Sequence, residues 1–299
     1  MALLFKEEGS PMMNPIFGGI SGAKLPVAEY DLGEGAVLKA TYAHVMSPFL
    51  MAFSPAEPGK PHPPPWNAVS GGLSHDVHIE LKIDSSGNPE WLIGTQALWW
   101  VVALLRLKAS WTLSAPVFAD RSFQDIPNTS GARLFPFELV ARRKVQAEDA
   151  LSDLALEDLA WVAQNWKRAA LLFHRDRNFA QAFQAFDNST IISSPALGLL
   201  TLWSALEHLF APSKQELRFR VSALIACYLT EPGEDRMQVQ KKLAKLYDER
   251  SQAAHTADEV EAEAASETFA IMRQVLLKII SEDRVPSRDF LEKLLFGAS

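Results

Sequence analysis

The residues best suited to chemistry lie in one short stretch, residues 246–256, with the sequence Leu-Tyr-Asp-Glu-Arg-Ser-Gln-Ala-Ala-His-Thr. Arg250 carries a permanent positive charge, and His255 is of the type whose unperturbed pKa lies near neutrality. Between them lie the small residues Ser251, Ala253 and Ala254. Because small side chains let another group approach closely, we take this stretch as the candidate site.

The elements around this stretch decide whether the two side chains can meet. Apolar residues at helical spacing predict a helix that ends at Arg250. Thr256, followed three residues later by Glu259, has the pattern of a capping box, so a new helix is expected to begin there. On one straight helix Arg250 and His255 would point roughly 140° apart. The expected break at His255 would instead let both side chains reach one cleft.

A second arginine and histidine, Arg168 and His174, have similar spacing. A pair of this kind is most often two solvated helix residues, so spacing alone identifies no site. The sequence that surrounds Arg250 and His255 has further features that the second pair lacks. We therefore predict that Arg250 and His255, and not Arg168 and His174, form the site.

Three segments precede His255 in order. Residues 202–210 read Leu-Trp-Ser-Ala-Leu-Glu-His-Leu-Phe, an expected helix carries Arg218 and Arg220, and residues 245–251 read Lys-Leu-Tyr-Asp-Glu-Arg-Ser. This order resembles the HEPN superfamily, in particular its abortive-infection-type branch, where an Ala-Leu-Glu-x-Leu-Phe helix precedes a Leu-Tyr-x-x-Arg-Ser-x-x-x-His junction. The resemblance covers roughly residues 150–299.

The resemblance implies a metal-independent endoribonuclease without a cofactor, in which a ribose 2′-OH attacks the adjacent phosphate. His255 would be the general acid or base, and Arg250 would stabilise the charge of the phosphorane. Ser251 could donate a further hydrogen bond, and Tyr247, one turn before Arg250, is expected to pack the cleft wall.

Two residues on other expected helices complete the candidate site. Glu207 lies among apolar residues, where it either orients packing as a partner of an N–H group or an arginine, or takes part in the site. Arg218 and Arg220 lie on different faces of their helix, so at most one points at the cleft, and we choose Arg218.

The resemblance also implies partners. RNA or a nucleotide would be the ligand, and two copies of the chain would form a homodimer with their Arg250–His255 junctions facing each other. Such proteins act in defence or as toxins, so an antitoxin or sensor partner is expected, and the N-terminal part could hold a recognition role.

Two alternatives stay open. Many active HEPN proteins carry Asn, Asp or His after the arginine, and many of this branch carry Gly after the histidine, whereas this chain has Ser251 and Thr256. The net charge of −7 opposes broad, non-specific binding of nucleic acid. The chain could therefore be a non-catalytic HEPN-like module that binds a nucleotide, an RNA or a partner protein. It could also be a helical scaffold without a nucleic-acid role.

The 299 residues are 48% hydrophobic and 22% charged, as in an ordinary soluble globular protein, and suit one large or two ordinary domains. Near residue 145 Ala, Leu, Glu and Gln become frequent and Gly nearly vanishes. We predict an α+β protein: residues 1–145 form a β-rich or α+β unit of unknown role, and residues 146–299 form an all-α, HEPN-like helical bundle.

Local patterns predict the individual elements. Gly and Pro predict an irregular segment over residues 1–70, with a possible strand within 36–46 and an extended loop over 55–66. Further elements are expected as a strand at 75–84, a turn at 85–88, a return strand at 91–93, a buried helix at 97–108, and short elements at 117–118 and 133–139. Helices are expected at 152–173, 178–186, 195–210, 214–229, 235–250, 256–280 and 287–295.

Other kinds of site are not expected. His75 and His78 would lie on opposite faces of a strand, which is poor geometry for one metal ion, and no Cys/His cluster appears. The single cysteine, Cys227, permits no intramolecular disulfide and fits a reducing compartment. No signal peptide is evident, and the longest apolar run, residues 97–105, is far below the roughly 20 residues needed to cross a membrane. We expect a cytoplasmic protein.

Overall fold

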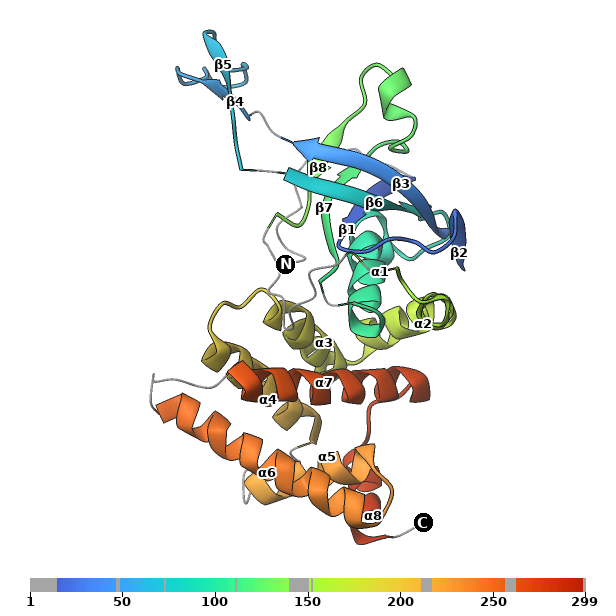
Figure 1. Ribbon diagram of the computed structural model, residues 1–299, viewed down its shortest axis with the longest axis vertical. Helices are drawn as coiled ribbons and strands as arrows, with labels where there is room; N and C mark the ends of the chain where they lie inside the picture. Colours follow the sequence, from blue (N-terminus) through green and yellow to red (C-terminus); the bar gives the residue numbers. More distant parts are fainter. Residues whose placement is uncertain are drawn as a thin grey trace.

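The computed structural model of the chain describes residues 15–46, 49–72, 74–110, 112–139, 151, 153–210, 217–255 and 262–297. A β-sheet with one helix against it forms one end of the molecule, and a group of helices forms the other (Figure 1). The predicted α+β fold is therefore confirmed. Within the described residues no helix is both long and apolar enough to cross a membrane.

The sheet has six antiparallel strands in the order β2-β3-β6-β1-β7-β8. Their bounds are β1 Ile16–Ser21, β2 Glu29–Gly33, β3 Ala36–Met46, β6 Ser74–Ile83, β7 Ser114–Ala119 and β8 Leu134–Pro136. A separate hairpin of β4 (Phe49–Ala52) and β5 (Trp66–Val69) projects from the sheet end (Figure 1). The strand predicted at residues 75–84 is confirmed as β6, whose Val77, Ile79, Leu81 and Ile83 are all buried.

The prediction of an irregular N-terminal segment is wrong for β1, which lies in the centre of the sheet between β6 and β7. Its sequence, Ile-Phe-Gly-Gly-Ile-Ser, lacks the alternation typical of strands. At Gly18 a Cβ atom would overlap the side chain of Leu98 on the adjacent helix. Glycine is therefore required there for close packing and is not a sign of a loop. The return strand predicted at residues 91–93 is also wrong, because this segment forms the 3-10 helix η1 (Glu90–Leu92).

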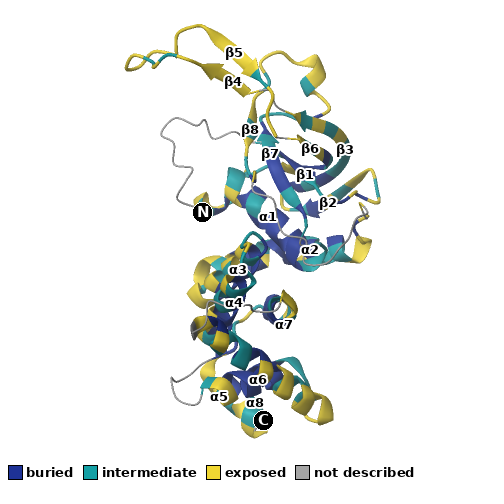
Figure 2. Cartoon of the chain, turned by 60° about the vertical axis from the view of Figure 1, so that its left-hand side comes forward, coloured by how far each residue is buried: buried dark blue, intermediate teal, exposed yellow. Residues whose placement is uncertain are grey.

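Helix α1 (Gly94–Lys108) confirms the buried helix predicted at 97–108. It lies between the sheet and the remaining helices and is buried on nearly all sides (Figures 1 and 2). The other helices are α2 Leu156–Arg175, α3 Arg177–Ser189, α4 Pro195–Phe210, α5 Leu217–Leu229, α6 Glu234–His255, α7 Ala262–Glu282 and α8 Arg288–Phe296. Seven helices were predicted in this part, and each overlaps one of these.

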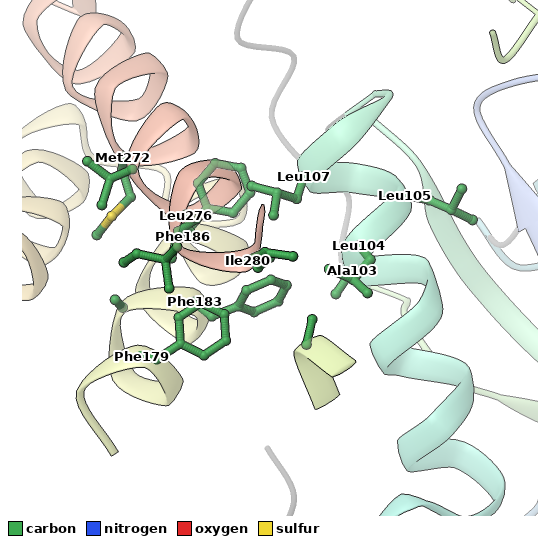
Figure 3. Close-up of a cluster of buried hydrophobic side chains, with 14 of the residues drawn as sticks. Ala103, Leu104, Leu105, Leu107, Phe179, Phe183, Phe186, Met272, Leu276 and Ile280 are labelled. Atoms are coloured by element: carbon green, nitrogen blue, oxygen red, sulfur yellow. The ribbon is translucent and has the colours of Figure 1, made fainter. Parts of the chain in front are cut away.

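One hydrophobic core extends from the sheet through α1 into the helices. Figure 3 shows where it crosses: phenylalanines of α3 (Phe179, Phe183, Phe186) and apolar residues of α7 (Met272, Leu276, Ile280) face side chains of α1 that include Leu107. Arg273 of α7 also donates hydrogen bonds to the carbonyls of Leu107 (2.6 Å) and Lys108 (2.5 Å), at the end of α1. The predicted domain boundary at 145–146 falls outside the described residues, and the parts on either side of it share this core.

Candidate functional site

Helix α6 is continuous from Glu234 to His255, so the prediction that it ends at Arg250 is wrong. On a regular helix Arg250 and His255 point roughly 140° apart. The side chain of His255 and all of residues 256–261, including the expected capping box of Thr256 and Glu259, lie outside the described residues. The helix break between residues 250 and 255, which was expected to let both side chains reach one cleft, is therefore absent from the described backbone.

The contact between α4 and α6 brings Glu207 and Arg250 together, as the sequence allowed. Arg250 Nη2 lies 3.1 Å from Glu207 Oε1 and donates to Oε2 at 3.4 Å. Their side chains are only 25% and 19% exposed. A pair so shielded from water is screened less than a surface pair. Glu207 thereby fixes the position of the guanidinium group.

Tyr247 packs against Arg250 in the same cluster. The Cζ atom of Arg250 lies 5.5 Å from the centroid of the tyrosine ring, within the range of a cation–π contact. The indole of Trp203 on α4 meets the same ring edge-on, with centroids 5.2 Å apart. Burial, and then the negative charge of Glu207, raise the pKa of Tyr247 above its usual value, so the phenol stays neutral.

Two buried donors at this cluster have no hydrogen-bond partner among the described residues: Nε of Arg250 and Nε1 of Trp203. A buried donor without a partner costs free energy unless water, a ligand or another group satisfies it. The hydroxyl of Ser251 does have a partner, because it donates to the carbonyl of Tyr247 at 3.0 Å, within the helix. Nε of Arg250 is thus a buried donor that no described residue satisfies.

Arg218 lies elsewhere. Its guanidinium forms two hydrogen bonds of 2.6 Å with the carboxylate of Asp248 on α6, and both side chains are about half exposed. Asp248 and Arg250 are two residues apart and so point to nearly opposite sides of α6. The structure therefore groups Glu207, Tyr247 and Arg250 and leaves Arg218 out.

Arg168 and His174, the second arginine–histidine pair, take part in two separate structural contacts. Arg168 donates to the carbonyl of Ile280 near the end of α7 (3.2 Å) and contacts Asn165. His174 is stacked on Trp91, with ring centroids 4.2 Å apart and an interplanar angle of 6°. Arg168 is thus a partner of the α7 backbone, and His174 belongs to an aromatic cavity lining.

A buried ionic cluster, which the sequence analysis missed, joins the sheet to the helices. Arg106 of α1 is 1% exposed and binds two carboxylates, with Nε 2.7 Å from Asp187 Oδ1 on α3 and Nη1 3.0 Å from Glu138 Oε2 after β8. Burial alone would lower the pKa of Arg106, but Asp187 and then Glu138 raise it above its usual value. A lone arginine in an otherwise apolar helix was the available signal, because a fully buried arginine needs partners.

Ser74, His44 and Asp76 lie in the order of a hydrolytic triad. His44 Nδ1 is 2.8 Å from Asp76 Oδ1, and His44 Nε2 is 3.4 Å from Ser74 Oγ. The Asp76 side chain is 51% exposed, whereas the orienting carboxylate of such a triad is buried. Neither of the two cavities described below includes these residues. We interpret them as a surface hydrogen-bond network.

A cavity of about 410 Å³ lies among η1, α1, α2 and α3, and a smaller one, of about 170 Å³, lies between α4 and α7. Neither includes Arg250 or Glu207.

Within the described residues no group of three or more His, Cys, Asp or Glu side chains is placed to hold a metal ion. No protein-family model, curated protein or solved structure matches the chain.

Proposed function

We propose that the protein is a metal-independent, HEPN-type endoribonuclease that acts in defence or as a toxin. The observation that carries this proposal is the way in which the guanidinium group of Arg250 is held. Glu207 and the ring of Tyr247 hold its guanidinium at the α4–α6 contact, while its Nε atom has no partner among the described residues. A guanidinium that is fixed in place, with its side chain 25% exposed, suits the stabilisation of charge on a phosphate.

His255 would transfer the proton in this reaction, as the general base for the 2′-OH or the general acid for the leaving oxygen. It lies at the last position of α6, one turn after Ser251. Because Arg250 and His255 diverge on one helix, we propose that two chains complete the site. Between them Ala254 is exposed, and its small side chain would let a second α6 approach closely.

Sedimentation tests this assembly. We expect the chain to sediment as a dimer at micromolar concentration, because the site requires two α6 helices. Replacing Ala254, which is exposed on α6, with tryptophan should shift the protein towards the monomer and reduce cleavage together. A wild-type monomer that nonetheless cleaves RNA would contradict the two-chain site.

The reaction itself is tested by incubating purified protein with mixed RNA in EDTA. We expect cleavage, with products that end in a 2′,3′-cyclic phosphate, because attack by the 2′-OH leaves this group. Products with a 3′-hydroxyl, or cleavage only after addition of a divalent metal, would contradict the proposal.

A second candidate is a non-catalytic module of the same type that binds RNA, a nucleotide or a partner protein. It is supported by the continuity of α6 and by Ser251, whose hydroxyl proton is already donated to Tyr247. Glu207 also offsets part of the charge of Arg250. Binding of labelled RNA without any cleavage, lost on Arg250→Ala, would favour this candidate over the enzyme.

A further inference from the structure

The larger cavity lies where the N-terminal unit meets the helices, far along the chain from Arg250. Its volume of about 410 Å³ falls within the range of small-molecule sites. Six flat rings contribute to its lining: Trp91, Trp99, Trp100, Phe137, Phe173 and His174. Such a concentration of rings suits a ligand that is itself flat and aromatic.

Hydrogen bonds hold the two central indoles in place. Trp99 Nε1 donates to Asp187 Oδ2 at 3.2 Å, and Trp100 Nε1 donates to the carbonyl of Trp166 at 2.8 Å. Asp187 is in turn bound by the buried guanidinium of Arg106. The ring of Phe173 packs against both indoles, at centroid distances of 5.9 and 5.0 Å. A ligand would therefore meet walls that are already ordered, which limits the entropy lost on binding.

The polar groups of the lining are neutral. They are the hydroxyl of Thr95 and the amides of Gln96, Gln184 and Asn188, and no Asp, Glu, Lys or Arg is found among the described residues that line the cavity. Gln96, Gln184 and Asn188 are exposed to solvent, and their amides make no hydrogen bond with any residue that the structure describes. Each amide offers donors and an acceptor on one planar group, which is the pattern that pairs with the edge of a nucleobase. Among the described lining residues a phosphate would find no lysine or arginine.

The stacked pair of Trp91 and His174 shows how a flat group is held at this cavity. The two rings are almost parallel, at 6°, although they come from η1 and α2. His174 is exposed to solvent, so this pair lies at the boundary of the cavity. Stacking on aromatic side chains is the usual means by which proteins bind unpaired bases.

From these observations we propose that this cavity binds the nucleobase of a nucleoside or nucleotide. The base stacks on the partly exposed rings of Trp91 and Trp99, its edge pairs with the amides of Gln184 and Asn188, and any phosphate remains outside in solvent. The proposal does not depend on ribonuclease activity, because it concerns a different part of the chain.

Calorimetric titration of the full chain with adenosine, guanosine, cytidine and uridine tests this site. We expect at least one nucleoside to bind, and ribose 5-phosphate, which has no base, not to compete. Trp91→Ala should weaken binding roughly 5- to 150-fold, the usual effect of losing a stacked base contact. Gln184→Ala should also weaken it, by roughly 5-fold or more, through loss of a hydrogen bond to the base edge.

Two matched variants serve as controls. Trp66→Ala removes an indole that is 53% exposed on the projecting hairpin, and Gln181→Ala removes an exposed amide from the same helix as Gln184. Neither residue lines the cavity, so both variants should bind as the wild type does. The proposal is overturned if no nucleoside binds at millimolar concentration, if ribose 5-phosphate competes equally, or if Gln184→Ala and Gln181→Ala bind alike.

Discussion

The variant His255→Ala is expected to lose RNA cleavage by roughly 10²- to 10⁴-fold, the usual contribution of a general acid or base. Its melting temperature should change little, because the residue is the last of α6 and its neighbours in the sequence are small or polar, so it should fill no core volume. The measurement is the rate at which a defined RNA is cleaved in EDTA by wild type and variant. If His255→Ala cleaves at the wild-type rate, the proposed catalytic role of α6 is wrong.

In the same assay, Arg250→Lys tests whether the positive charge of Arg250 is sufficient or whether the planar guanidinium group is also needed. Lysine keeps the positive charge near Glu207 but lacks the planar fork that can bind a carboxylate and a phosphate together. We therefore expect a loss of activity nearly as large as that of His255→Ala. Arg288→Lys, a change at an exposed ion pair on α8, is the matched control and should keep full activity. Full activity in Arg250→Lys would show that charge alone suffices.

Arg106→Met is expected to lower the free energy of unfolding by about 3 to 5 kcal/mol, the usual effect of removing one partner from a buried ionic cluster. Methionine fills much of the same volume, but Asp187 and Glu138 would then share the buried site without a positive charge. Thermal unfolding should show a fall in the melting temperature of roughly 5 to 8 °C.

An exposed arginine provides the comparison for this effect. Arg218 also makes two hydrogen bonds with one carboxylate, but its side chain is 57% exposed. Because exposed pairs are screened by solvent, Arg218→Met should change the melting temperature far less than Arg106→Met. Equal effects of the two substitutions would show that burial is not what makes the Arg106 cluster important.

Elements whose pattern reflects burial on one face could be predicted from the sequence. The alternation in β6 and the helical spacing of the phenylalanines in α3 each place one face in the core, and both elements were found. β1 could not be found in this way, because Gly18 replaces the large side chain that alternation would require. The hairpin of β4 and β5 was hidden by its prolines and by exposed apolar residues, such as Phe49 and Leu50, that pack on no core.

The candidate site was predictable only in part. Glu207 stood out as an acidic residue in an apolar helix, and the structure supplies its partner, Arg250. The end of α6 was misjudged because small and polar residues after Arg250 resemble a helix end, whereas alanine favours continuation. The aromatic cavity was beyond a single sequence, since its rings come from separate elements whose packing brings them together.

The bonds from Arg273 to the end of α1 span 165 and 166 residues of chain. During synthesis from the N-terminus, the last carbonyls of α1 cannot accept these hydrogen bonds until α7 has been synthesised. The same delay applies to the α7 side chains that cover the α1 and α3 core (Figure 3). Contacts between residues so distant in sequence form late, because the chain must first lose the conformational entropy of closing the long loop between them. The N-terminal half therefore reaches its final packing only when nearly the whole chain has left the ribosome.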